Sequence, residues 1–132
     1  MEVWKILLVD DDPEDRAIIK DAMAMHNAES IIHFAENGEQ ALDILTKNLT
    51  EHGIPCLVVL DLNMPRMNGL ETLKHIKQHE KLMEIPVVIY STSINPLEKE
   101  KCMRLGALDF FIKPVSFQES KETAQKLLSF CT

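Results

Sequence analysis

The chain has 132 residues, of which 45% are hydrophobic and only 5% are aromatic. This length fits a single domain whose aliphatic core needs no disulfide or metal to fold. Its 14 basic and 21 acidic residues give a formal net charge of −7, which argues against a nonspecific surface for nucleic acids or anionic membranes. The longest apolar stretches, residues 6–9 and 56–60, are far too short to span a bilayer.

The number and spacing of the cysteines indicate the redox compartment of the protein. Cys56, Cys102 and Cys131 are an odd number and have no CxxC spacing. This pattern is typical of reduced thiols in a cytoplasm rather than of a secreted disulfide framework, and the sequence shows no signal peptide. We therefore expect a cytoplasmic protein with three free thiols.

The first half of the chain alternates apolar runs with segments of helical spacing. Residues 3–9 predict a strand, and Asp12 followed by Pro13 is typical of a helix N-cap and first helical position. That helix is expected from Pro13 until its apolar stripe fades near 26–27. A second strand is predicted at 31–34, and Asn37-Gly38 then leads into a second helix that extends to about residue 49.

The second half continues this alternation. Residues 56–60 form a run of five apolar residues, typical of a strand buried on both faces. Helical spacing follows from residue 69 to about 80, and further strands are predicted at 87–90 and 107–112. The helix that should begin at Pro96 is the least amphipathic of the set, and a last helix is expected from about 117 to 130.

Strict alternation of five strands and five helices predicts the α/β class. Right-handed crossovers return each strand parallel to the last, so the sheet should be parallel and five-stranded, with helices on both faces. Periodicity does not give the strand order. The carboxyl ends of parallel strands share one edge of the sheet, where α/β proteins form their sites. The polar residues that follow the predicted strands at this edge are Asp10, Asp11, Asp61, Ser91 and Lys113.

The carboxylates at this edge predict a cation site. Carboxylates at close range raise one another's pKa, so they cannot all stay ionised without a compensating cation. Mg²⁺ prefers oxygen ligands in octahedral geometry and keeps several waters, so two carboxylates and a carbonyl would suffice. We therefore expect Mg²⁺ as the cofactor.

Four motifs jointly resemble one family. They are Ile6-Leu-Leu-Val-Asp-Asp11, Val58-Val-Leu-Asp-Leu-Asn-Met-Pro65 with Asn68-Gly69, Pro86-Val-Val-Ile-Tyr-Ser91 and Phe110-Phe-Ile-Lys-Pro114. Through them the whole chain resembles the receiver domain of response regulators and is similar to the single-domain chemotaxis regulator. The resemblance implies a doubly wound, flavodoxin-like fold with strand order 2-1-3-4-5. It also implies that residues 1–132 form one receiver domain without an output domain.

The resemblance assigns the acidic residues to phosphoryl transfer. Asp61 corresponds to the phosphoacceptor. The magnesium ligands that the resemblance implies are Asp10, Asp11, Asp61 and the backbone carbonyl of Asn63. Within that set Asp11 would ligate the ion directly, while a third consecutive acid, Asp12, is expected only to cap the following helix.

Four further residues match the switch machinery of the family. Ser91 corresponds to the hydroxyl that bonds the phosphoryl group, and Lys113 to the lysine that pairs with it. Phe110 corresponds to the aromatic switch residue, although a static core position is an equally good interpretation because strand aromatics usually pack. Pro114 corresponds to a proline that usually follows a cis peptide bond.

The implied function is that of a stand-alone response regulator in a two-component phosphorelay. A sensor histidine kinase or a histidine phosphotransfer protein would donate the phosphoryl group to Asp61, and the domain would catalyse only its own phosphorylation and slow dephosphorylation. Movement of Ser91 and Phe110 would change the surface read by an unknown target protein. A homodimer is one form that the active state could take, and we expect no nucleic-acid or membrane partner. The polar segment 47–53, which precedes the third predicted strand, resembles the corresponding insert in receivers that serve phytochrome-type kinases.

Two other functions stay open. A pseudo-receiver would keep the fold and bind partners without being phosphorylated, although the intact set of Asp11, Asp61, Ser91 and Lys113 argues against it. A haloacid-dehalogenase-type phosphatase also uses a strand-end aspartate and Mg²⁺. It would need a second aspartate two positions on, where this chain has Asn63, and usually a cap insertion.

A few side chains have competing interpretations. Thr92 or Ser93 could take the role of Ser91, but their spacing from the predicted strand is less favourable. His75 and His79 stand four residues apart on a predicted helix, a spacing that can ligate zinc, but the sequence offers no third ligand.

Overall fold

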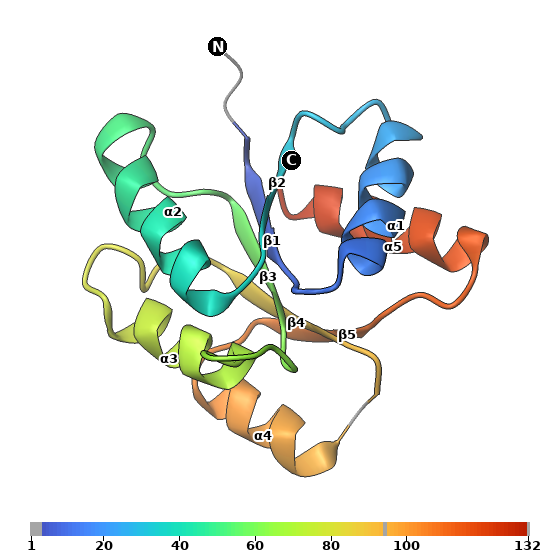
Figure 1. Cartoon of the computed structure of the whole chain (residues 1–132). Coiled ribbons are helices and arrows are strands. Elements are labelled where there is room, and N and C mark those ends of the chain that lie inside the picture. Colours follow the sequence, from blue (N-terminus) through green and yellow to red (C-terminus); the bar gives the residue numbers. More distant parts are fainter. Residues whose placement is uncertain (1–3, 94, 132) are drawn as a thin grey trace.

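The computed structural model describes residues 4–93 and 95–131, in which strands and helices alternate as the sequence predicts (Figure 1). The strands are β1 (Ile6–Val9), β2 (Ile32–Ala35), β3 (Leu57–Asp61), β4 (Val87–Ser91) and β5 (Asp109–Ile112). The helices are α1 (Pro13–Ala24), α2 (Gly38–Glu51), α3 (Gly69–Gln78), α4 (Pro96–Arg104) and α5 (Phe117–Ser129). None of the described helices has the length and apolar character needed to cross a membrane.

The five strands form one parallel sheet in the order β2-β1-β3-β4-β5. This confirms the fold class and the strand order that the resemblance implies. The register places Val9 of β1 opposite Leu60 of β3, so the residues that follow them, Asp10 and Asp61, lie side by side at the carboxyl edge. At the other side of β4, Ser91 lies opposite Ile112 of β5, which brings Lys113 to the same edge.

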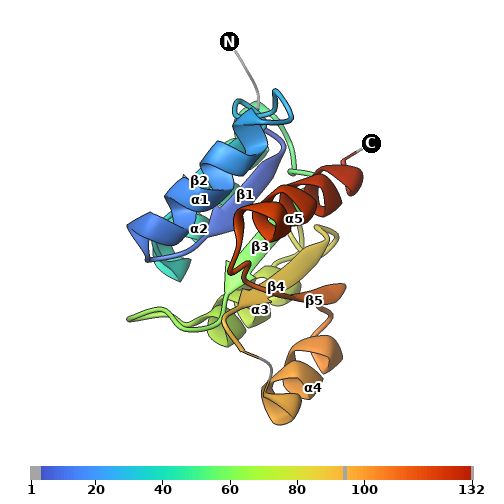
Figure 2. The same cartoon turned by 90° about the vertical axis from the view of Figure 1, so that its right-hand side faces the viewer.

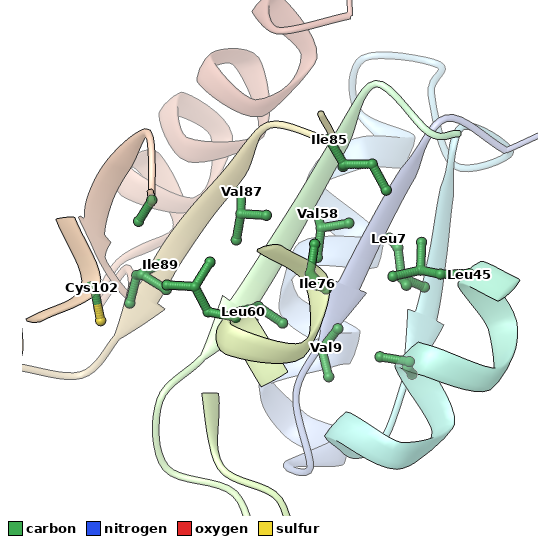
Figure 3. Close-up of a cluster of buried hydrophobic side chains, with 14 of the residues drawn as sticks. Leu7, Val9, Leu45, Val58, Leu60, Ile76, Ile85, Val87, Ile89 and Cys102 are labelled. Carbon is green, nitrogen blue, oxygen red and sulfur yellow. The ribbon is translucent and has the colours of Figure 1, made fainter. Parts of the chain in front are cut away.

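Helices cover both faces of the sheet (Figures 1 and 2). On one face, alternate residues of the strands pack against α2, α3 and α4, and Figure 3 shows this cluster with Leu45 of α2 and Ile76 of α3 above the strands. On the other face, the intervening strand residues pack against Ile19 and Met23 of α1 and Leu127 of α5. Strands buried on both faces explain why their sequences are continuous apolar runs instead of alternating patterns.

Each helix begins at a side-chain cap. The N-caps are Asp12, Asn37, Asn68, Asn95 and Ser116, and each side chain accepts a hydrogen bond from a backbone N–H of the first helical turn. The capping role predicted for Asp12 is therefore confirmed. In α3 the cap is reciprocal, because the Glu71 side chain accepts from the Asn68 backbone N–H in turn.

The observed bounds differ from the predicted ones by a few residues. β1 begins at Ile6, and residue 3 of the predicted strand lies outside the described residues. β5 begins at Asp109 rather than at residue 107, because the backbone N–H of Ala107 still donates to Cys102 at the end of α4. β3 extends to Asp61, so the expected phosphoacceptor is the last residue of a strand and not the first of a loop.

The expectation of three free thiols is wrong. A disulfide joins Cys56, just before β3, to Cys131, just after α5, with their Cα atoms 5.5 Å apart. Only Cys102 is free, and it is the buried residue of α4. The sequence did not predict this disulfide, because 75 residues separate the two cysteines. Only the folded topology brings them together.

Candidate functional site

The structure brings three predicted carboxylates together at the carboxyl edge of the sheet. Asp10 follows β1, Asp11 comes next in the loop, and Asp61 ends β3. Each offers an oxygen atom to a group in which all three atoms lie within 4.8 Å of one another. Asp10 and Asp61 are buried, whereas Asp11 is exposed. Solvent therefore reaches the cluster from the side of Asp11, while Asp10 and Asp61 are shielded from it.

Backbone amides orient the two buried carboxylates. The N–H of Asp12 donates to Oδ1 of Asp10 at 3.0 Å, and the N–H of Asn63 donates to Oδ1 of Asp61 at 3.2 Å. Both contacts span two residues, so the turn that follows each strand fixes the carboxylate that ends it. The Arg16 guanidinium also donates to the backbone carbonyl of Asp10 at 2.7 Å and holds the β1–α1 loop.

A glycine permits the close approach of α3 to this site. A Cβ atom at Gly69 would lie 2.3 Å from the carbonyl oxygen of Asp61 and 2.8 Å from the Cα atom of Leu62. The backbone N–H of Gly69 donates to the carbonyl of Leu62 at 3.1 Å. The start of α3 is thus packed directly on the backbone that carries Asp61.

Lys113 places a buried ammonium group among the carboxylates. Its Nζ atom lies 2.8 Å from Oδ2 of Asp10, 2.7 Å from Oδ2 of Asp15 and 3.3 Å from Oδ2 of Asp61. The Lys113 side chain is only 8% exposed, and its backbone N–H donates to the carbonyl of Ser91 at 2.6 Å. The convergence of Lys113 with Asp10 and Asp61 agrees with the strand-end prediction.

Asp15 is a site residue that the sequence analysis missed. It lies in the first turn of α1, where an acidic residue is adequately explained by the helix dipole. Its sequence position could have identified it. Asp15 comes four residues after Asp11, in the helix that begins at the carboxyl edge of the sheet. In the structure Asp15 accepts the shortest of the three Lys113 contacts.

Burial and charge together set the protonation of the site. Burial raises the pKa of Asp61 to about 6, with help from the negative charge of Asp10, while Lys113 and the Asn63 amide oppose the rise. Burial alone would lower the pKa of Lys113, but the carboxylates of Asp10, Asp15 and Asp61 outweigh it and raise that pKa. The ammonium group therefore stays charged, while the Asp61 carboxylate lacks full compensation.

The residues present fit a hard divalent cation. The three clustered groups offer oxygen atoms only, which is the ligand chemistry of Mg²⁺. Oδ2 of Asp10 is buried and accepts no hydrogen bond of good geometry, although Nζ of Lys113 lies 2.8 Å away. A second cation would complete its environment and neutralise the excess of carboxylates over the single ammonium group.

Ser91 and Phe110 lie on the neighbouring strands β4 and β5. Ser91 is the last residue of β4 and is buried, whereas Thr92 and Ser93 are exposed. Phe110 lies opposite Ile89 of β4 and is already buried in the cluster that faces α3 and α4. A switching role for Phe110 stays a prediction.

Two other expectations have clear outcomes. The described residues contain no cis peptide bond, so the cis bond expected before Pro114 is wrong, and trans is the ordinary state of such a bond. Among the described residues, the only group of three metal-binding side chains is Asp10, Asp11 and Asp61. His75 and His79 therefore have no third ligand within that part of the chain.

Comparison with known proteins agrees with this geometry. The profile of the response regulator receiver domain matches residues 6–125. The chain belongs to the response regulator receiver family. A CheY homologue of Campylobacter jejuni is 32% identical over 124 residues, covering 94% of this chain and 92% of the homologue. The rice two-component response regulator ORR3 is 34% identical over 110 residues, or 83% of this chain and 79% of the relative.

Solved response regulators share the fold. The phosphorylated cyanobacterial phytochrome response regulator RcpA has a TM-score of 0.84 at 28% identity, covering 97% of this chain and 94% of RcpA. The Mn²⁺-bound form of response regulator Rcp1 has a TM-score of 0.81 at 27% identity, covering 96% and 92%. The bacteriophytochrome response regulator AtBRR is 32% identical, with a TM-score of 0.76 and coverage of 98% and 95%. The chain is thus a signalling domain of two-component systems.

Proposed function

We propose that the chain is a stand-alone receiver that accepts a phosphoryl group on Asp61 in the presence of Mg²⁺. The observation that carries this proposal is the convergence of Asp10, Asp11 and Asp61 within 4.8 Å, with Lys113 Nζ 3.3 Å from Asp61. An acyl-phosphate site needs a carboxylate nucleophile together with cations that neutralise the transferring group. The Asp61 carboxylate ends β3, and Lys113, which follows β5, supplies one such cation beside it.

The protein's own groups position the reaction. The amide of Asn63 holds Oδ1 of Asp61, and Lys113 holds Oδ2, so the carboxylate presents a fixed direction of attack. A bond forms between an Asp61 oxygen and phosphorus, and the bond from phosphorus to the donor histidine nitrogen breaks. Mg²⁺, held by Asp10, Asp11, Asp61 and the Asn63 carbonyl, would neutralise phosphoryl charge when bound. Lys113 would pair with a second phosphoryl oxygen.

The signal to a target protein would follow from the charge that phosphorylation adds at Asp61. Phosphorylation adds a charge of about −1.5 to −2 and strong acceptor oxygens. We expect the Ser91 hydroxyl, buried at the end of β4, to move toward these oxygens and donate a hydrogen bond to one of them. Phe110 lies on the neighbouring strand, so the surface of α4, β5 and α5 is where we expect the change to be read by a target protein.

We propose a histidine kinase or a histidine phosphotransfer protein in the cytoplasm as the phosphoryl donor. Receivers of this family interact with such proteins. Several structural relatives, including RcpA and AtBRR, are described as phytochrome or bacteriophytochrome response regulators. A phytochrome-type kinase is therefore the first donor class to test.

Incubation with acetyl phosphate, followed by intact mass measurement, tests the proposal. One labile phosphoryl adduct should form with Mg²⁺, disappear when EDTA replaces the metal, and be absent in Asp61→Asn. Asp43→Asn changes an exposed aspartate on α2 and should be phosphorylated normally. Absence of an adduct in the presence of Mg²⁺ would instead support a pseudo-receiver, and turnover of many substrate equivalents would support a phosphatase.

A further inference from the structure

The disulfide links two elements at the edge of the sheet opposite the acidic site. Cys56 immediately precedes β3, the strand that ends at Asp61, so the two residues lie at opposite ends of one strand. Cys131 follows the last turn of α5. The Cα separation of 5.5 Å lies within the usual range for disulfides. The backbone therefore allows the bond without any displacement of β3 or α5.

The two cysteines differ in how their backbone is held in the fold. Cys56 is fixed by the sheet, because its backbone N–H donates to the Lys5 carbonyl at 2.9 Å and its Sγ lies 3.1 Å from the same oxygen. Cys131 is held by the end of α5, through one backbone hydrogen bond to Leu128 at 3.0 Å. The disulfide is the covalent tie between this helix end and the sheet.

The tie lies beside the strand that carries the expected switch residue. The ring of Phe130, which precedes Cys131, lies 6.3 Å from the ring of Phe111 in β5. Phe111 follows Phe110 in that strand. Fixing Cys131 therefore also fixes the aromatic contact through which the end of α5 rests on β5.

We propose that Cys56 and Cys131 form a reversible redox site that responds to low-molecular-weight disulfides such as oxidised glutathione. One cysteine thiolate attacks the small disulfide, forming a mixed disulfide and releasing one small thiolate. The second cysteine thiolate then attacks the mixed disulfide and releases the other small thiolate. The net exchange oxidises two protein thiols and reduces one small disulfide to two thiols, and a high concentration of small thiol drives it back.

Accessibility distinguishes this pair from the third cysteine. Cys56 and Cys131 are partly exposed, so a small disulfide can reach them. Cys102 is fully buried, and burial, together with the charge of Glu98, raises the pKa of its thiol. Because the thiolate is the reactive form, Cys102 should stay inert. It serves as an internal control within the same chain.

Reversibility is the property that matters for function. The inference rests on the proposed cytoplasmic location, where persistent structural disulfides are rare and those that form are usually transient or redox-sensing. The oxidised bond closes a loop of 75 residues that contains Asp61, Ser91 and Lys113. Oxidation would therefore stabilise this segment and anchor α5, giving the domain an input independent of phosphorylation.

To test the proposal, the 132-residue chain is equilibrated in glutathione buffers that range from fully reduced to fully oxidised. Samples are quenched with acid, denatured, alkylated and measured by intact mass. We expect two alkylation sites to disappear together in one transition that is the same from both directions, leaving the single label on Cys102. The oxidised form should melt roughly 10 °C higher than the reduced form, because the cross-link constrains the unfolded chain. Amides in the last turn of α5 should exchange more slowly.

Single substitutions make the result specific. Cys102→Ser should keep the paired transition and the shift in Tm, whereas Cys56→Ser and Cys131→Ser should each lose both. Persistence of all three labels in the most oxidising buffer would overturn the proposal. So would a pair that stays oxidised in the most reducing buffer, or glutathione adducts and cross-linked dimers in place of the internal bond. None of these outcomes depends on phosphorylation of Asp61, so failure here leaves the proposed function standing.

Discussion

Asp61 is a buried carboxyl group whose titration should appear in the stability of the metal-free protein. Its pKa is raised from 3.8 to about 6, so the folded state binds its proton more tightly than the unfolded state does. The free energy of unfolding should therefore fall as pH rises through this interval and remain lower above it. Asp61→Asn should be more stable than the parent at neutral pH by about 2 kcal/mol. Urea unfolding in EDTA across this pH range measures the difference.

The comparison with Asp43→Asn isolates the buried carboxyl. Asp43 is exposed on α2, so its substitution should leave the pH dependence of the parent unchanged. If Asp61→Asn retains the same slope as the parent between mildly acidic and neutral pH, the raised pKa of Asp61 is contradicted. Lys113 remains paired with Asp10 and Asp15 in this variant, so no unpaired buried cation complicates the result.

Lys113 has the opposite effect on stability, because it is the single ammonium group among several carboxylates. Lys113→Met would leave Asp10, Asp15 and Asp61 without their common partner and should lower the free energy of unfolding by roughly 3–5 kcal/mol at neutral pH. Loss of the Lys113 charge would let the pKa of Asp61 rise further, so part of the loss should be recovered as pH falls. Denaturant unfolding at neutral and mildly acidic pH measures both effects.

Lys126→Met is the matched control for this substitution. Lys126 is exposed in the last turn of α5, so the same change in side chain should cost little at any pH. Equal losses in both variants would show that the buried Lys113 ammonium contributes no more to stability than an exposed one, and would contradict its role as the shared counter-ion.

At the scale of single residues, the sequence predicted the charged groups at the strand ends better than it predicted contacts between distant residues. Asp10, Asp61 and Lys113 could be placed together because each follows a predicted parallel strand. Asp15 could not, because an acid in a first helical turn already has a sufficient local explanation. The Cys56–Cys131 bond escaped for a different reason, since pairing over 75 residues depends on three-dimensional closeness that periodicity does not report.

The start of α3 packs directly on the backbone of Asp61. Gly69 at its start leaves no room for a side chain, because a Cβ would approach the Asp61 carbonyl oxygen to 2.3 Å. Gly69→Ala gains about 1 kcal/mol in helix propensity but must displace the backbone of β3. We expect a net loss of roughly 1–3 kcal/mol in stability and slower phosphorylation by acetyl phosphate.

The control for α3 is Lys74→Ala, at an exposed position of the same helix. It should change neither the phosphorylation rate nor, beyond a few tenths of a kcal/mol, the stability. Phosphorylation of Gly69→Ala at the parental rate would show that α3 can move away without disturbing Asp61. Rates are measured by intact mass at fixed acetyl phosphate and Mg²⁺ concentrations.

The predicted elements were most reliable where burial is greatest. The strands β3 and β4, buried on both faces, have continuous apolar sequences that fix their positions within a residue, as at residues 87–90 against the observed Val87–Ser91. The weak amphipathicity predicted for the helix from Pro96 is also real, because α4 buries only Cys102. Strand order lay beyond periodicity, since local patterns are the same for any order of parallel strands, and came instead from the family resemblance.

Across the whole molecule, the two edges of the sheet carry different chemistry. The carboxyl edge holds the acidic cluster and Lys113, while the opposite edge holds the disulfide. Between them lie two apolar clusters, one on each face of the sheet. A local event at either edge must therefore act through closely packed strands and helices, which shift between discrete arrangements and do not deform continuously.

Global stability should consequently report occupation of the acidic site. We expect beryllofluoride with Mg²⁺ to bind the Asp61 carboxylate of the folded protein as a mimic of the phosphoryl group. At about a hundredfold excess over Kd, such binding adds about 2.7 kcal/mol, or roughly 10 °C in Tm. The shift should be complete in Asp43→Asn and absent in Asp61→Asn, and neither Mg²⁺ nor fluoride alone should reproduce it. Scanning calorimetry measures the shift, and an equal rise in Asp61→Asn would place the bound group elsewhere on the molecule.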